Sequence, residues 1–176
     1  MGHPVLRTKA RPLERSEIKS VSVQKLIDDL IETMREYHGV GLAAPQVHEG
    51  LRLFTAAIDV ENPGDSEDPG DDAEGGEPIV LINPEITPVG AGIVEDWEGC
   101  LSIPDIRGLV PRAKEIVVRA YDRKGDRLEI RAHDFPARVI QHETDHLDGV
   151  LFLDRMESFE SLTFLAEYSR YWTKDS

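Results

Sequence analysis

The segment around His142 combines residue types that can hold and use a metal ion. His142 and His146 are four positions apart, so on a helix both imidazoles lie on one face and can bind one ion. Glu143 lies beside that face, where its carboxylate can take a proton from a metal-bound water whose pKa the ion has lowered. This His-Glu-x-x-His pattern predicts a hydrolytic metal centre.

A catalytic site of this kind usually has a third protein ligand, and the sequence offers few candidates. Metzincins place a further histidine where this chain has Phe152, and thermolysin-like enzymes take a downstream glutamate, for which Glu167 is the one candidate at a comparable distance. Cys100, the only cysteine, offers a thiolate that suits zinc or ferrous iron. A lone cysteine is more often an inert buried side chain, but Gly99 before it permits a close backbone approach.

Two helices are expected to frame the chemistry. Apolar residues recur at helical spacing from 23 to 34, with Ser22 as the expected N-cap and Gly39 as the expected end. A second helix is expected to be capped by Asp134 and to carry the metal motif as far as Leu147.

Strands are expected between these helices, and a further helix after them. Apolar runs and alternation predict strands at 51–60, 78–83 and 86–94, a hairpin of 115–121 with 127–132, and a helix at 157–172. Pro104 and Gly108 indicate that the stretch after Cys100 is a loop. This order predicts an α+β fold, with small mixed or antiparallel sheets around a central metal-binding helix and with N- and C-terminal helices. We expect a single catalytic domain over 1–176.

Length and composition exclude other classes of protein. The 176 residues suffice for one domain with a sizeable core, and no apolar stretch has the length of a membrane helix. The formal charge of -14 argues against binding to nucleic acid or to an anionic membrane. Eight acidic residues and no basic ones lie in 61–78, which we expect to be a solvated loop insertion. A single cysteine and the absence of a signal-peptide pattern predict a cytoplasmic protein.

Three segments resemble the signature motifs of the peptide deformylase family, in the order and spacing of that family. They are Gly-Val-Gly-Leu-Ala-Ala-Pro-Gln at 39–46, Glu-Gly-Cys-Leu-Ser at 98–102 and Gln-His-Glu-Thr-Asp-His-Leu at 141–147. The segments 3–7 and 103–112 are also similar to that family. The resemblance covers nearly the whole chain apart from the acidic segment and the C-terminal tail, and three agreeing motifs are far more specific than one.

The resemblance implies an enzyme that removes the formyl group from N-formylmethionine on new polypeptides and releases formate. It implies one divalent metal, ferrous iron in most members and zinc in some, held by Cys100, His142 and His146 with water in the fourth position. That water would attack the formyl carbon, with Glu143 as general base and then as general acid. The oxyanion donors would be the side-chain amide of Gln46 and the backbone N–H of Leu101.

Further positions are implied to contact the substrate. The backbone at Gly41 should pair with the extended peptide. Three side chains are expected to line an apolar pocket for the methionine side chain: Val40, Phe135 and Val139. Glu98 is expected to orient neighbouring groups, and Arg107 is expected to fix the loop after the cysteine or to approach the substrate backbone.

The sequence departs from the family at several positions. Asp134 stands where members commonly have glycine, and Pro136 stands where they have another residue, which indicates an altered start of the metal-binding helix. Some members dock on the ribosome through a longer basic tail, and the short, near-neutral tail of this chain offers little such attraction. The residues leave two alternatives to a deformylase, a zinc peptidase that cleaves internal bonds and a binding protein without catalysis.

Overall fold

A computed structural model of the chain describes residues 1–60 and 78–173, and all but one residue of the acidic segment lies outside them. The helices are α1 (Arg15–Ile18), α2 (Val21–Glu36), α3 (Asp134–Leu147), α4 (Phe152–Arg155) and α5 (Leu165–Tyr171), with short 3-10 helices η1 (Pro4–Arg7), η2 (Ala44–Val47) and η3 (Phe159–Ser161). The strands are β1 (Gly41–Ala43), β2 (Leu53–Ala56), β3 (Ile79–Pro88), β4 (Ile93–Cys100), β5 (Ile103–Ala113), β6 (Glu115–Tyr121), β7 (Arg127–His133) and β8 (Thr163–Phe164). Among these described residues, no helix is long and apolar enough to cross a membrane.

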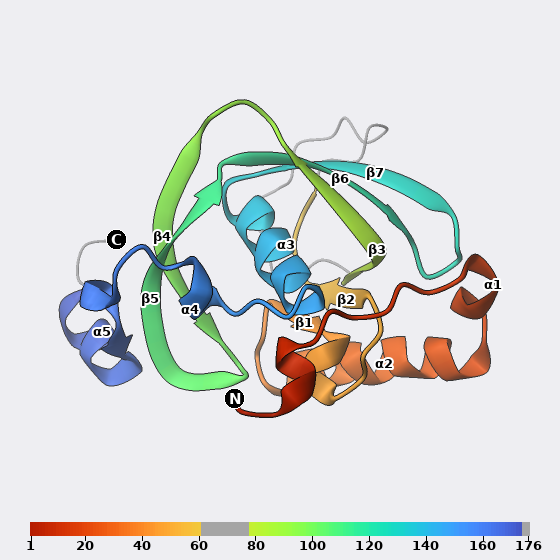
Figure 1. The fold of residues 1–176 in the computed structure, drawn as a ribbon, viewed down its shortest axis with the longest axis horizontal. Helices are drawn as coiled ribbons and strands as arrows, with labels where there is room; N and C mark the ends of the chain where they lie inside the picture. Colours follow the sequence, from red (N-terminus) through yellow and green to blue (C-terminus); the bar gives the residue numbers. More distant parts are fainter. Residues whose placement is uncertain (61–77, 174–176) are drawn as a thin grey trace.

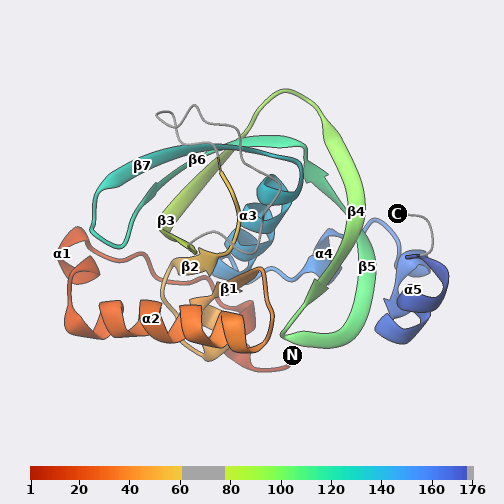
Figure 2. The same ribbon diagram turned by 180° about the vertical axis from the view of Figure 1, so that it is seen from behind.

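The strands form two sheets in which all neighbours are antiparallel. One sheet has the order β1-β2-β3-β6-β7 and the other the order β4-β5-β8. Helix α3 runs through the middle of the molecule between the five-stranded sheet and the long β4–β5 hairpin (Figure 1). Seen from behind, α2 passes along the region of β1 and β2 (Figure 2). The predicted α+β fold around a central helix is confirmed.

Strands β1 and β2 and the first half of β3 are buried on both faces, which explains their continuous apolar runs. Leu53 packs with Leu30 of α2 in one core cluster. Phe54, its neighbour in β2, packs with Ile140 of α3 in another. Because successive strand residues point to opposite faces, these clusters show that α2 and α3 cover opposite sides of the sheet. The helix that carries the metal motif therefore has one face packed against the sheet, and this packing fixes its position.

Helix α2 is confirmed, but both predicted ends are wrong. Its N-cap is Ser20, whose side chain accepts a hydrogen bond from the N–H of Val23, so Ser22 lies inside the helix. At the other end His38, with φ of 51°, takes the left-handed conformation that we expected for Gly39. The N–H of Gly39 instead donates to the carbonyl of Met34 and closes the last turn.

Three predictions about the middle of the chain are wrong, wholly or in part. The strand expected at 86–94 does not exist as one element, because β3 continues to Pro88 and a turn with Gly90 at φ 68° separates it from β4. The expected loop after Cys100 is strand β5, which pairs with β4 along most of its length. Backbone pairing with β4 outweighs the turn preference of Pro104 and Gly108. The strand expected at 51–60 is only the short β2.

The hairpin of β6 and β7 is confirmed, and so is the extent of α3. The N-cap of α3 is His133, however, and not Asp134, which is the first helical residue and has φ of 51°. A left-handed conformation favours glycine, and aspartate is among the few other residues that adopt it with any frequency. The helix expected at 157–172 is wrong over its first half, where η3 and β8 precede the short α5.

Candidate active site

Helix α3 and the end of β4 bring the three expected metal ligands together. The rings of His142 and His146 lie on one face of α3, with centroids 5.0 Å apart. Cys100 ends β4 beside a register shift in the β4–β5 ladder, and its Sγ lies 3.2 Å from His146 Nε2. One ligand atom from each of the three residues lies within 4.8 Å of the others, which is the convergence that a shared ion requires.

The alternative third ligands lie elsewhere. Phe152 is buried in the apolar cluster beneath β5, and its ring packs against that of His142 at a centroid distance of 6.4 Å. Glu167 is on α5 and pairs with Arg170. Among the described residues, the cluster of possible metal ligands therefore contains neither of them.

The two imidazoles are prepared differently for metal binding. His142 Nδ1 lies 2.8 Å from Glu98 Oε2, which fixes the ring and leaves Nε2 for an ion. Burial opposes a proton on His142, but hydrogen bonds to Cys100 and Glu98 outweigh it and raise the pKa of this ring to about 10. Burial lowers the pKa of His146 to about 3, so that ring is neutral and its nitrogen lone pair is free to bind an ion. A thiolate with two neutral imidazoles fits a divalent iron or zinc ion, and binding of the ion would release the proton that His142 otherwise carries.

Glu143 lies under the same cluster with almost no contact with solvent. Burial raises the pKa of its carboxyl group to about 7, and its Oε2 has no hydrogen-bond partner among the described residues. The group fits only because β1 has no side chain at Gly41, where a Cβ atom would lie 2.4 Å from Glu143 Oε1. An unpartnered buried carboxylate beside metal ligands is suited to exchange protons with a reacting group.

Gln46 presents its amide nitrogen to the cysteine. Its Oε1 accepts a hydrogen bond of 2.8 Å from the N–H of Ala43, which sets the orientation of the amide. Its Nε2 then donates toward Ser102 Oγ at 3.3 Å and Cys100 Sγ at 3.6 Å. The local turn at η2 thus fixes a donor at the mouth of the ligand cluster.

A cleft of about 540 Å³ opens over this cluster. Eleven of the twelve residues predicted for the site line it: Val40, Gly41, Gln46, Glu98, Cys100, Leu101, Arg107, Phe135, Val139, His142 and Glu143. The twelfth, His146, is buried below the opening. The cleft continues past the predicted residues to Trp97, Pro104 and Leu165.

A buried ion network behind the cleft escaped the sequence analysis. Arg112 donates to both oxygens of Glu98 at 2.9 Å and to Asp145 at 2.5 Å, and Arg138 also donates to Glu98 at 2.8 Å. Burial disfavours the charge of Glu98, but its hydrogen bonds from Arg112 and His142 hold its pKa at about 2. Asp145 lies inside the metal motif and gave some signal. The arginines gave none, because such side chains are normally exposed.

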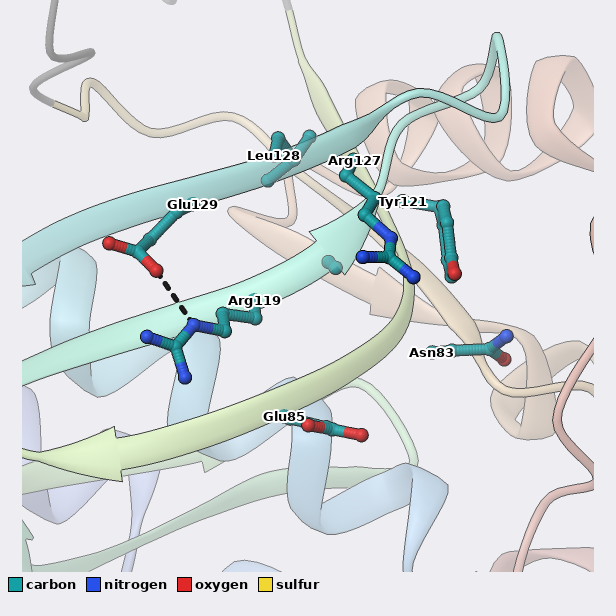
Figure 3. Close-up of a pocket in the computed structure, with 8 residues that line it drawn as sticks. Asn83, Glu85, Arg119, Tyr121, Arg127, Leu128 and Glu129 are labelled. Atoms are coloured by element: carbon teal, nitrogen blue, oxygen red, sulfur yellow. Dashed lines mark hydrogen bonds and ion pairs between the residues drawn. The ribbon is translucent and has the colours of Figure 1, made fainter.

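A second hollow, of about 490 Å³, lies over strands β3, β6 and β7. Figure 3 shows Arg119 and Glu129 joined across neighbouring strands, with Glu85 nearby. None of the three possible metal ligands, Cys100, His142 and His146, lines this hollow. The chemistry is therefore concentrated in the cleft above α3.

Comparison with known proteins agrees with this location. A sequence model for the family described as polypeptide deformylase matches residues 1–161. Peptide deformylase 2 of a Nostoc species is 46% identical over 176 residues, which is 100% of this chain and 94% of the relative. The peptide deformylase of Dictyoglomus thermophilum is 46% identical over 155 residues, covering 88% of each chain.

Solved structures give the same result. The crystal structure of peptide deformylase from Thermotoga maritima matches with a TM-score of 0.75 and 39% identity, over 90% of this chain and 95% of that one. The class I type b peptide deformylase from Acinetobacter baumannii with bound Met-Ala-Ser matches with a TM-score of 0.76 and 36% identity, over 89% and 94%. The chain therefore belongs to the polypeptide deformylase family, and it is a metal-dependent hydrolase that removes the formyl group from N-formylmethionine on new polypeptides.

Proposed function

We propose that Cys100, His142 and His146 hold the divalent metal ion of this deformylase, with ferrous iron as the expected ion and zinc as the alternative. The observation that carries the proposal is the convergence of these ligand atoms within 4.8 Å, at the base of a cleft and beside a buried carboxylate. When bound, the ion supplies a Lewis acid that polarises the formyl carbonyl and makes water a stronger nucleophile.

Glu143 moves the proton in this proposal. Its carboxylate takes a proton from the attacking water and returns it to the amine that leaves the formyl carbon. Burial places its pKa at about 7, so the group can both accept and donate a proton near neutral pH. Its position against Gly41 keeps it next to the strand along which the substrate would lie.

The amide of Gln46 and the backbone N–H of Leu101 stabilise the negative charge that develops on the formyl oxygen. The support for Gln46 is its fixed orientation, which points Nε2 toward the ligand cluster. Leu101 follows Cys100 directly and lines the cleft. Donors held in place before the reaction need no reorganisation as the charge forms.

The peptide binds as an added strand along Gly41. β1 is the edge strand of its sheet, so its outer side can pair with an extended chain. The methionine side chain enters the apolar part of the cleft at Val40, Phe135 and Val139. A relative crystallised with Met-Ala-Ser supports a peptide of this kind as the occupant. Because nascent polypeptides are made in the cytoplasm, we place the activity there.

Glu98 acts as a positioning residue for His142 and touches no reacting atom. Arg107 borders the cleft, with its guanidinium over Gly99, where a Cβ atom would lie 2.0 Å from Nη1. The guanidinium therefore packs against the backbone just before the cysteine, while its Nη1 donates a hydrogen bond to the carbonyl of Ile106.

Release of formate from formyl-Met-Ala-Ser tests the proposal, with the protein loaded with ferrous iron or with zinc under exclusion of air. We expect turnover with wild type, one metal ion per chain, and retained metal in Glu143→Ala with activity reduced at least a hundredfold. Glu85→Ala, on the outer surface, is the matched control and keeps full activity. Absence of turnover from the fully loaded wild type refutes the assignment, and turnover by Glu143→Ala removes that residue from the mechanism.

A further inference from the structure

The C-terminal segment Thr163–Trp172, here called the C-terminal arm, is attached to the strand that borders the cleft. Its first two residues form β8, in which Thr163 pairs with Arg107 and Phe164 with Ile106 of β5. Helix α5 begins immediately afterwards, and its first residue, Leu165, lines the cleft. The backbone pairing thus fixes where an apolar side chain of the arm meets the opening.

The arm also contacts Trp97, a second residue that lines the cleft. This side chain comes from β4 and lines the cleft. Its ring makes an edge contact with Tyr168 at a centroid distance of 5.0 Å and a tilted contact with Trp172 at 5.4 Å. Because Glu98, the next residue in the strand, points into the buried ion network, Trp97 points to the opposite face, where α5 packs.

Trp97 and Leu165 line the same cleft as Val40, Phe135 and Val139, but they are not among the side chains assigned to the apolar pocket. The formyl group must reach the ligand cluster, and the methionine side chain fills the pocket at Val139. Residues that follow methionine must then lie along the remaining walls of the cleft, which include Arg107 and Leu165 of the arm. There they meet Leu165 and Trp97, which present an apolar surface.

We infer that the C-terminal arm determines specificity for the residues that follow the formylated methionine, with Leu165 and Trp97 contacting apolar side chains there. Tyr168 and Trp172 act as positioning residues for Trp97. The inference rests on the proposed function, because it assumes that the formyl group lies at the Cys100 cluster.

The test compares kcat/KM for two substrates, the short formyl-Met-amide and the longer formyl-Met-Leu-Leu-amide, in the metal-loaded protein. We expect Leu165→Ala to lower kcat/KM about tenfold for the longer substrate, mainly through KM, and less than twofold for the short one. Leu162→Ala is the matched control, since this exposed leucine precedes the arm and does not line the cleft. This variant should leave the ratio of kcat/KM between the two substrates unchanged.

An equal loss on both substrates, or no loss on either, overturns the inference. If wild type releases no formate even from formyl-Met-amide, the proposed function itself fails, which is a different result.

A binding measurement gives an independent readout. In Trp172→Phe, Trp97 is the only tryptophan left, so its emission reports on the wall directly. We expect Met-Leu-Leu-amide to shift that emission and Met-amide to leave it unchanged, and the opposite pattern also overturns the inference.

Discussion

Replacement of Arg112 with methionine removes the cation that joins two buried carboxylates. Arg112 and its partners Glu98 and Asp145 are each less than a tenth exposed, and three hydrogen bonds join them. Removal of one partner from a buried ion pair typically costs about 3–5 kcal/mol, because the remaining charge stays buried without compensation. Arg138 still contacts Glu98 and Arg155 still contacts Asp145, so we expect about 3 kcal/mol.

That loss is large beside the roughly 5–15 kcal/mol that stabilises a typical domain. It is measured by urea unfolding of the metal-free protein at pH 7, as the difference in unfolding free energy between Arg112→Met and wild type. The matched control is Arg119→Met, which breaks the exposed ion pair with Glu129 and has a far smaller effect. Equal effects of the two substitutions would refute the reasoning that burial makes the network important.

The same variant tests how the network acts on the metal site. Glu98 holds the ring of His142, and loss of such an outer partner typically weakens metal binding about 10- to 100-fold. Competition with a chelator measures this change, and Arg119→Met should show none. Unchanged metal affinity in Arg112→Met would mean that Glu98 positions the ring without help from the arginine.

Two further predictions follow from single contacts. Gly41→Ala places a Cβ atom against Glu143, so formate release should fall about a hundredfold. Gly50→Ala meets no atom within 4 Å and should leave formate release unchanged, and equal activity of both variants would contradict this account. Burial disfavours the charged form of Asp154, but hydrogen bonds from Arg7 and from a backbone N–H outweigh burial and lower the pKa of this carboxyl group. The charged carboxylate therefore stabilises the fold above about pH 4, and this stabilisation is lost as the pH falls further. In urea unfolding between pH 6 and 3, the stability difference between wild type and Asp154→Asn should shrink below about pH 4, and a constant difference would show that the ion pair does not matter.

Local sequence signals predicted the elements whose stabilising contacts lie close in the chain. The amphipathic pattern identified α2, and alternation around Gly125 identified the β6–β7 hairpin. The ends were less predictable. Ser20 and Ser22 are both good N-caps by residue type, and the structure uses Ser20. The strand β5 was missed because its pairing with β4 overrides the turn preference of its prolines and glycine.

The sequence by itself determined the chemistry of this protein. The four-residue spacing of His142 and His146 places both rings on one helical face, and the three family motifs supplied Cys100 and Gln46 as their partners. Tertiary structure alone decided which distant groups surround them, namely the arginines behind Glu98 and the arm beside Trp97. The physical reason is that helical spacing is a local property of the chain. A buried ion pair or an aromatic contact such as these exists only after separate strands and helices have paired in register and packed together.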